Sequence, residues 1–363
     1  MSNDITWMKS ALALARRGLG NVAPNPAVGC LIVKGNKVMG RGWTQLGGRP
    51  HAETEALAQA GSNAQGSTVY VTLEPCAHYG KTPPCAEALV RAGVARVVIA
   101  TQDPDARVSG QGIEILEKAE IELTLGVLAA EAQELNEGFF CKVNSGRPSF
   151  SLKMAMTIDG KIATSGQESK WITGVAARQY GHMLRAQHDA ILVGVNTVLA
   201  DDPDLSCRIT GLIHRSPTKI ILDSDLRTPP TAKFFKSSPD VATLVIANKP
   251  METSAKAKAL AAAGGQLHYV NNVHDVAEVA RLLGTIGFTR ILVEGGGQVH
   301  ASFLKANMAE TMFVFTAGKI IGEDGIAGIG TMSLAELARA PHFTLTKHQK
   351  IGADLLATYK NAG

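Results

Sequence analysis

The chain has 363 residues, which at about 150 residues per domain corresponds to two or three domains. Hydrophobic residues make up 45% and charged residues 19%, a composition that is typical of folded globular proteins and excludes a disordered tail protein. Lysine and arginine number 36 against 32 acidic residues, too small an excess to indicate a nucleic-acid or membrane surface by itself. Small-molecule partners are therefore favoured.

Helices and strands alternate over the first 140 residues. The predicted helices are 4–17, 51–60, 85–92, 112–119 and 129–140, and the predicted strands are 28–33, 37–43, 68–73, 96–100 and 121–125. Because the loops between them are short, this alternation predicts a sheet sandwiched by helices.

A polar, turn-rich stretch at 144–148 separates this series from a second one. We expect a domain boundary there, with domains at 1–146 and 147–363. The strands predicted in the second domain are 149–155, 190–193, 219–222, 242–247, 266–270, 290–293, 311–316 and 354–359. Helical segments fall between most of them, which predicts a second α/β domain.

The chain shows no apolar run of the roughly 18 residues that a membrane span needs, and its start lacks the features of a secretory signal. We therefore expect a cytoplasmic protein without a membrane partner. Its five cysteines are odd in number and thinly spread, unlike a disulfide scaffold. Cys76 and Cys85 lie close enough in sequence to suggest a metal site, whereas we expect Cys30, Cys141 and Cys207 to serve in packing.

The strongest motif is His51-Ala52-Glu53, followed by Pro75-Cys76 and then Cys85. It matches the H-x-E and P-C-x-x-C signature of zinc deaminases, except that eight residues separate the cysteines. One imidazole and two thiolates give zinc three ligands and leave the fourth position open for water, as in catalytic sites. Glu53 is close enough to move a proton from this water to a departing amine. The alternative is a helix-capping histidine with two buried cysteines, which this combination of residues makes improbable.

Three segments resemble the deaminase half of the bifunctional riboflavin-biosynthesis deaminase-reductases: residues 24–29 (PNPAVG), 51–53 (HAE) and 72–85 (TLEPCAHYGKTPPC). The resemblance implies a cytidine-deaminase-like three-layer domain that removes an amino group from 2,5-diamino-6-(5-phosphoribosylamino)pyrimidin-4-one. It places Asn25, His78, Lys81 and Asp103 at the substrate. Family members commonly have His at Thr44, Ser at Ala77 and Asn at Asp105, so these departures alter polar contacts to the substrate and leave the metal ligands unchanged.

The second half lacks the G-x-G-x-x-G fingerprint of a Rossmann domain after a strand. It has instead residues 153–161 (KMAMTIDGK), 171–173 (WIT), 198–203 (VLADDP) and 293–297 (VEGGG), each at a predicted strand end or in a loop. The glycines 295–297 between strand and helix suit a pyrophosphate, although a tight turn explains such a run equally well.

Together these segments resemble the dihydrofolate-reductase-like reductase domain of the same family. The resemblance implies NADPH reduction of the ribosyl group, through its ring-opened form, to give 5-amino-6-(5-phosphoribitylamino)uracil. It places Ala155, Trp171, Thr197, Asp201, Ser224, Gly296 and Gly297 at the cofactor. It places Ser169, Arg185, Leu205, Arg208 and Glu294 at the substrate.

The chemistry of the charged residues is compatible with this assignment. The guanidinium groups of Arg185 and Arg208 suit a phosphate, with surface ion pairs as the alternative. Lys153, Asp201 and Glu294 are candidates for an electrostatic role near the substrate, since the hydride itself comes from the cofactor.

Two other functions remain open at this stage. A deaminase acting on transfer RNA shares the H-A-E and P-C features, but the cysteine spacing, the fused second domain and the lack of a basic tract argue against it. A non-catalytic zinc-stabilised binding module predicts four protein ligands, and three are visible. The apolar content over two domains also permits a homo-oligomer.

Overall fold

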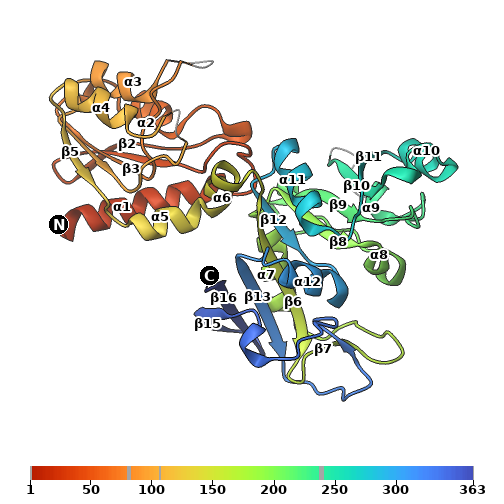
Figure 1. Cartoon of the computed structure of the whole chain (residues 1–363). Coiled ribbons are helices and arrows are strands. Elements are labelled where there is room, and N and C mark those ends of the chain that lie inside the picture. The colour runs from red at the N-terminus through yellow and green to blue at the C-terminus, as the bar shows by residue number, and fades with distance from the viewer. Residues whose placement is uncertain (1, 80–82, 106–107, 237–240, 363) are drawn as a thin grey trace. The chain divides into compact units, whose positions relative to one another are not determined.

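A computed structural model describes residues 2–79, 83–105, 108–236 and 241–362 of the chain. Its contacts divide the chain into two compact units, Met1–Gly146 and Arg147–Gly363 (Figure 1). The division falls where the turn-rich stretch predicted a boundary. Each unit has its own sheet and its own hydrophobic core.

In its described part, the first unit has a five-stranded sheet with the order β2-β1-β3-β4-β5. β1 pairs antiparallel with β2 and β3, whereas β3, β4 and β5 run parallel. The strands are β1 (Gly29–Lys34), β2 (Lys37–Trp43), β3 (Thr68–Val71), β4 (Arg96–Ile99) and β5 (Glu122–Leu125). The helices are α1 (Ser2–Ala15), α2 (Ala52–Ala60), α3 (Cys85–Arg91), α4 (Gln111–Lys118), α5 (Ala129–Leu135) and α6 (Glu137–Ser145).

Successive residues of β1 point to opposite faces of this sheet, as strand geometry requires. Cys30 and Ile32 join a core with α2, α3 and α4. Leu31 and Val33 join a second core with α1 and α5. The predicted three-layer arrangement is therefore confirmed, with α1 and α5 on one face in Figure 1 and α2, α3 and α4 on the other.

Glycines in β2 let α2 approach the sheet closely. A β-carbon at Gly40 would overlap the carbonyl oxygen of Ala56, and one at Gly42 would overlap that of Ala52. Because α2 begins at Ala52, directly after His51, this packing fixes the position of the helix start that carries the H-A-E motif.

The predicted helix 129–140 is wrong in one respect, because Asn136 separates α5 from α6. The Asn136 side chain is buried and bonds to the backbone of Ala27, which explains the interruption. The helix also continues through residues 144 and 145, which were predicted to belong to the linker. It ends at Gly146, whose φ of 67° is accessible to glycine without a steric penalty.

In its described part, the second unit has a nine-stranded sheet with the order β11-β10-β9-β8-β12-β6-β13-β16-β15. The seven strands from β11 to β13 in this order run parallel, and β16 and β15 extend the sheet as an antiparallel hairpin. The parallel strands are β6 (Ser149–Thr157), β8 (Ala190–Gly194), β9 (Thr218–Leu222), β10 (Thr243–Asn248), β11 (Gly265–Val270), β12 (Arg290–Val293) and β13 (Thr311–Ala317). The hairpin strands are β15 (Phe343–Ile351) and β16 (Asp354–Asn361).

Helices cover both faces of this sheet. From β8, Ala190 and Leu192 pack in a core with α11 and α12, whereas Ile191 and Val193 pack with α8, α9 and α10. On that second face α7 packs against β12 and β13. The helices are α7 (Val175–Ala186), α8 (Val195–Asp201), α9 (Lys233–Lys236), α10 (Ala255–Ala262), α11 (Val276–Ile286) and α12 (Gly297–Lys305).

Three strands of the second unit were not predicted. β7 (Lys161–Ala163) and β14 (Ile326–Ala327) form a small separate sheet and are too short to show a period. β15 lies at a sheet edge with most of its residues exposed, so its sequence lacks the apolar alternation of a half-buried strand. A two-residue turn beginning at Gly352, with φ 62°, joins β15 to β16.

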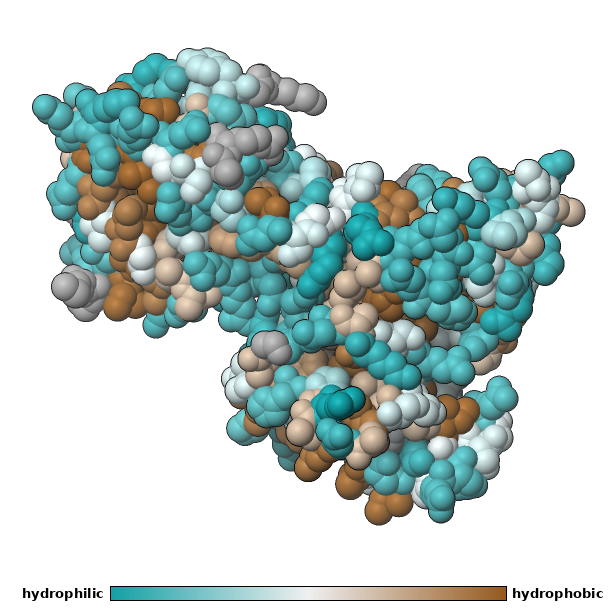
Figure 2. All heavy atoms as spheres, viewed as in Figure 1, coloured by the Kyte–Doolittle hydropathy of each residue, from teal (hydrophilic) through white to brown (hydrophobic). Residues whose placement is uncertain are grey.

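No helix in the described ranges is both long and apolar enough to cross a membrane. Hydrophilic residues make up most of the face shown in Figure 2, with hydrophobic residues in small groups between them.

The close approach of β2 to α2 gives the first testable prediction. Gly42→Ala places a methyl group on the Ala52 carbonyl oxygen, so α2 must shift. We expect a destabilisation of about 1–3 kcal/mol, the usual cost of overpacking, measured by thermal unfolding. Gly318→Ala is the control, because a β-carbon there meets no described atom within 4 Å. Equal melting temperatures for the two variants would contradict this account.

Candidate functional site

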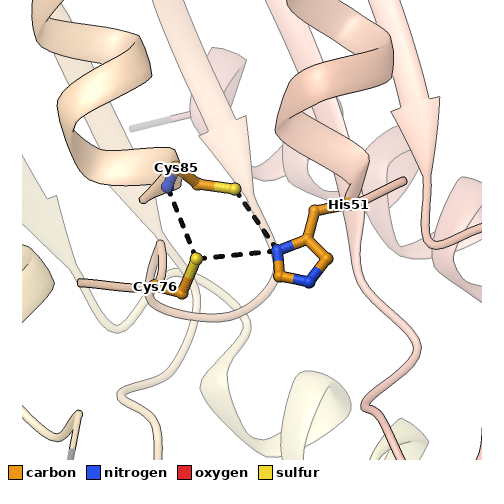
Figure 3. Close-up of side chains that lie close together, drawn as sticks. All are labelled: His51, Cys76 and Cys85. Carbon is orange, nitrogen blue, oxygen red and sulfur yellow. Dashed lines mark hydrogen bonds between the residues drawn. The ribbon is translucent and has the colours of Figure 1, made fainter. Parts of the chain in front are cut away.

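His51, Cys76 and Cys85 meet in the first unit, as Figure 3 shows. The Nδ1 atom of His51 lies 3.6 Å from the Cys76 sulfur and 3.4 Å from the Cys85 sulfur. Among the described residues they are the one group of His, Cys, Asp or Glu side chains placed to hold a metal ion. The structure thus brings together all three ligands predicted from the sequence.

The spacing of these atoms fits a single zinc ion. With Zn–N near 2.05 Å, Zn–S near 2.3 Å and tetrahedral angles, the nitrogen–sulfur distance in a zinc site is about 3.6 Å. Both observed distances lie close to this value. Two thiols and one imidazole are also ligand types that zinc prefers, so the donor set and the geometry agree.

Local structure explains how three distant positions converge. His51 directly precedes α2, and Cys85 is the first residue of α3. Cys76 lies in the loop after β3, where its sulfur accepts a hydrogen bond from the Cys85 backbone N–H at 3.4 Å. A further bond, from the Ala86 N–H to the Cys76 carbonyl at 3.2 Å, closes the ends of the loop between the two cysteines.

Glu53 lies in the first turn of α2, two residues after His51, and its side chain is buried. Burial and, after it, the negative charge of the neighbouring Cys76 together raise the pKa of Glu53 to about 7. A hydrogen bond from Cys85, together with contacts to His51, lowers the pKa of Cys76 to about 4. Ionisation of the thiols therefore begins at Cys76, and Glu53 can gain or lose a proton near neutral pH.

Three of the four predicted substrate residues of this unit, Asn25, His78 and Asp103, lie in loops. Asn25 is half-buried and packs against Gly48. A β-carbon at position 48 would overlap the Asn25 side chain. Asp103 is buried, and burial followed by the charges of Asp105 and Glu74 raises its pKa to about 6. His78 is exposed, and Lys81 lies outside the described residues.

The three departures from the family pattern occupy different environments. The buried Thr44 hydroxyl accepts from the Val28 N–H at 2.9 Å and donates to the Pro26 carbonyl at 3.0 Å, so Thr44 holds the loop that carries Asn25. Ala77 is half-buried beside Cys76. The backbone N–H of Asp105 donates to the Asp103 carboxyl at 2.9 Å.

In the second unit, most of the predicted residues lie at the carboxyl ends of four adjacent parallel strands. These strands are β9, β8, β12 and β6, in that order across the sheet. Crevices at this edge of parallel sheets are common ligand sites. Ser224 follows β9, Thr197 and Asp201 lie in α8 after β8, Glu294 to Gly297 follow β12, and Lys153 and Ala155 lie in β6.

Glu294 is the electrostatic centre of this edge. Arg185 donates to it through Nε at 2.8 Å and NH2 at 3.0 Å, and the Lys153 ammonium lies 3.5 Å away. The side chain of Glu294 is 8% exposed and that of Arg185 is 15% exposed. Although burial opposes ionisation, the two cations lower the pKa of Glu294. Arg185 also donates through NH1 to the Ser206 carbonyl at 2.9 Å, so much of its guanidinium is engaged within the protein.

The three glycines after β12 have separate structural reasons. A β-carbon at Gly295 would lie 2.7 Å from the Gly194 nitrogen, and one at Gly297 would lie 2.6 Å from the Ala327 carbonyl oxygen. Gly296 has a positive φ of 26° and approaches the Thr197 hydroxyl. The run is therefore needed for packing, and Gly296 and Thr197 lie together as the cofactor assignment requires.

The remaining predicted residues lie on loops around this edge. The Ser169 hydroxyl contacts the Asp201 carboxyl at 3.5 Å, which joins a predicted substrate residue to a predicted cofactor residue. Trp171 is exposed, with the Arg178 guanidinium stacked 4.3 Å from its ring centre. Leu205 has φ 64° and a side chain buried in the core, so it offers only backbone groups to a substrate. The Arg208 side chain is exposed.

Comparisons with known proteins match both units. Residues 1–101 match the cytidine and deoxycytidylate deaminase zinc-binding region, and residues 148–357 match the RibD C-terminal domain. The chain is 42% identical over 357 residues to the riboflavin biosynthesis protein RibD of Aquifex aeolicus, with 98% of each chain covered. The identity to the Escherichia coli RibD is 37%, with 97% of this chain and 98% of that protein covered.

This chain belongs to the RibD family. Solved structures agree: Acinetobacter baumannii RibD, form 1, superimposes with a TM-score of 0.89 at 36% identity, covering 100% of this chain and 99% of that chain. A Thermotoga maritima diaminohydroxyphosphoribosylaminopyrimidine deaminase/5-amino-6-(5-phosphoribosylamino)uracil reductase superimposes with a TM-score of 0.86 at 33% identity, covering 99% of both chains.

As a RibD, the chain is a bifunctional enzyme of riboflavin biosynthesis, with a zinc-dependent deaminase activity and an NADPH-dependent reductase activity. The predicted fold class, family and pair of cofactors are confirmed.

Sequence reasoning missed two residues of the RibD reductase unit. Arg178 stacks on Trp171, and His182 Nδ1 contacts both the Ser206 carbonyl and the Arg208 N–H. Burial, with the nearby Arg185 and Arg208, lowers the pKa of His182 to about 4, so it is neutral at physiological pH. Arg178, His182 and Arg185 are spaced by four and three residues in α7, so one helix face carries all three. This pattern in the sequence could have identified them.

The Glu294 cluster gives the second prediction. Glu294→Gln removes the negative charge between Arg185 and Lys153 and leaves two cations without compensation. Since breaking a buried pair costs about 3–5 kcal/mol, we expect reductase activity to fall by at least about 10²-fold. Reductase activity is followed as NADPH oxidation with the deaminated substrate supplied. Ammonia release in the same preparation is the control and should be unchanged, and a variant with full reductase activity would refute the central role of Glu294.

Proposed function

We propose that residues 1–146 carry out the deamination and residues 147–363 the reduction. The substrate of the first reaction is 2,5-diamino-6-(5-phosphoribosylamino)pyrimidin-4-one, which becomes the corresponding uracil. The second reaction reduces the ribosyl group to ribityl and gives 5-amino-6-(5-phosphoribitylamino)uracil. The observation that carries this proposal is the three-ligand group of His51, Cys76 and Cys85 with the buried Glu53 beside it.

In the deaminase reaction, His51, Cys76 and Cys85 would hold the zinc ion, which would supply a binding site for a water molecule. Zinc, when bound, lowers the pKa of a water molecule to about 7 and so makes it a nucleophile at neutral pH. Glu53 takes one proton from this water and delivers it to a ring nitrogen, and it then passes the second proton of the water to the departing amino group. The carbon–nitrogen bond breaks, ammonia leaves, and the water oxygen becomes the new ring carbonyl oxygen. A carboxyl with a pKa near 7 suits both proton transfers.

Asn25, His78, Lys81 and Asp103 are proposed to recognise the pyrimidine ribotide. In support, Asn25 and Asp103 lie in loops that the protein holds firmly by buried hydrogen bonds. The amide of Asn25 can both donate and accept, and the carboxylate of Asp103 accepts from amino or ring N–H groups.

In the reductase reaction, bound NADPH would supply a hydride to C1 of the ring-opened ribosyl group, with one proton taken up from solvent, and would leave as NADP⁺. The chain binds and orients the two reactants. Residues assigned to the cofactor are Ala155, Trp171, Thr197, Asp201, Ser224, Gly296 and Gly297. Residues assigned to the substrate are Lys153, Ser169, Arg185, Leu205, Arg208 and Glu294, with the exposed Arg208 as the guanidinium best placed for a phosphate.

The proposal includes a cytoplasmic location, a small-molecule substrate rather than a nucleic acid, and self-association into a homo-oligomer. The small excess of basic residues, 36 against 32 acidic, gives no support to a nucleic-acid surface. The exposed edge strand β15 offers unpaired backbone groups to a second copy. Light scattering on the purified chain measures the number of subunits.

The order of the two reactions gives the third prediction. With the diaminopyrimidine ribotide, we expect ammonia release without NADPH, and NADPH oxidation only after deaminated product has formed. Glu53→Gln should keep one zinc per chain while ammonia release falls by at least about 10²-fold, the usual effect of losing a general acid–base. The same variant should reduce added deaminated substrate normally. NADPH oxidation that precedes ammonia release, or unchanged turnover in Glu53→Gln, contradicts the proposal.

The buried carboxyl of Asp103 gives the fourth prediction. Because its pKa is raised to about 6, it is ionised above that pH and becomes protonated below it. The KM of the deaminase for the ribotide should therefore rise as the pH falls below 6, approaching tenfold per pH unit. Asp103→Asn should have a high KM at all pH values and lose this dependence. A wild-type KM that is constant between pH 5 and about 7.5 excludes Asp103 as an ionised acceptor.

A further inference from the structure

The segment Thr72–Cys76, which follows β3, carries more than a zinc ligand. Its alternate residues Thr72, Glu74 and Cys76 each have a buried or half-buried side chain. Cys76 belongs to the zinc group, but Thr72 and Glu74 have no role in the reaction described above. Their hydrogen bonds show what they do.

Glu74 is 3% exposed and binds four backbone N–H groups of one neighbouring segment. Its Oε2 accepts from Asp103 at 3.3 Å and Gly110 at 3.1 Å. Its Oε1 accepts from Gly112 at 3.0 Å and Ile113 at 3.3 Å. The last two are in the first turn of α4, so Glu74 caps this helix from another part of the chain.

Close packing makes this connection rigid. A β-carbon at Gly112 would overlap the Pro75 carbonyl oxygen, so the start of α4 lies directly against the residue between Glu74 and Cys76. Asp103, which is proposed to bind the substrate, is therefore held at a fixed distance from a zinc ligand through one buried carboxyl group.

Thr72 makes an equivalent connection to the segment that follows Asn25. It is fully buried, and its hydroxyl oxygen accepts from the Gly29 N–H at 3.0 Å. The two preceding N–H groups are bound in the same way, Ala27 by the Asn136 side chain at 2.8 Å and Val28 by Thr44 at 2.9 Å. The backbone N–H groups of Ala27, Val28 and Gly29, which follow Asn25 in the chain, therefore each donate to a buried side chain.

We propose that Thr72 and Glu74 are positioning residues that fix the Asn25 loop and the Asp103 loop, respectively, relative to the zinc ligand Cys76. Three residues of one short segment thereby hold two recognition loops and the metal at fixed positions relative to one another. This inference rests on the proposed assignment of Asn25 and Asp103 to the substrate. Because Thr72 and Glu74 are proposed to act on substrate recognition, substituting them should change mainly the deaminase KM.

Two variants that preserve shape test this inference. Thr72→Val removes the hydroxyl acceptor, and Glu74→Gln replaces one acceptor oxygen with an amide group that faces N–H donors. Because a buried N–H that loses its acceptor weakens the support of its loop, we expect the deaminase KM for the ribotide to rise by about 5- to 150-fold in each variant. Zinc content should stay at one per chain and kcat should change less than KM. Thr72→Ser, which keeps the hydroxyl, should restore the KM.

The matched control is Ser67→Ala, at the opposite end of β3. The buried Ser67 hydroxyl donates to the Ala64 carbonyl at 2.6 Å and is remote in the strand from the loop with Cys76. Its loss should lower the melting temperature without changing KM. In every variant, a zinc content of one per chain reports that the deaminase unit is folded, and reductase activity with deaminated substrate reports the same for the second unit.

Double variants distinguish positioning from a general loss of stability. Thr72→Val should add little to the KM of Asn25→Ala, and Glu74→Gln should add little to that of Asp103→Asn, because each pair acts through one loop. The crossed pairs, Thr72→Val with Asp103→Asn and Glu74→Gln with Asn25→Ala, should multiply their effects. Multiplied effects in all four pairs, or an unchanged KM in both single variants, overturn the inference. If Asn25→Ala and Asp103→Asn themselves leave KM unchanged while wild-type enzyme deaminates, the substrate assignment is wrong and the inference fails with it.

Discussion

Buried backbone N–H groups set the main constraint on the deaminase half. Loops that enclose a substrate leave the regular pairing of the sheet, yet their donors still need acceptors when they are shielded from water. In this chain the acceptors come from side chains at the end of β3 and around it: Thr72, Glu74, Thr44 and Asn136. The zinc ligand Cys76 belongs to the same stretch of chain, so the recognition loops and the metal share one support.

In the reductase half, the buried groups that need partners are charged side chains rather than backbone N–H groups. Glu294 follows β12 at the sheet edge where the residues proposed for the cofactor and the substrate gather, and its side chain is only 8% exposed. A carboxylate in such a place is stable only with cations beside it, which Arg185 and Lys153 provide. The two hydrogen bonds to Glu294 therefore fix the orientation of the Arg185 guanidinium. Any contact of Arg185 with the substrate uses its remaining N–H donors.

The sequence alone predicted what depends on residue type at short range. His51, Glu53, Cys76 and Cys85 could be identified because zinc chemistry restricts both the ligand types and the neighbouring carboxylate. The arrangement of a sheet between helices followed from the alternation of helices and strands with short loops. Buried strands such as β1 could be found because they are short continuous apolar runs. The partner of Asn136 is 109 residues away, as is the partner of Arg185, and no local pattern encodes such pairs. Edge strand β15 escaped prediction because exposed strands need no apolar period.

The glycines 295–297 show why a motif is weaker evidence than the arrangement around it. Gly295 is required by its approach to Gly194, and Gly297 by its approach to Ala327, so neither needs a phosphate to explain it. Support for a cofactor at this edge comes instead from topology. Because β9, β8, β12 and β6 are adjacent and parallel, their carboxyl ends bring Ser224, Thr197 and Gly296 to one side of the sheet from positions far apart in the chain. That convergence supports a binding edge more strongly than the glycine run does, because tight turns alone do not bring these side chains together.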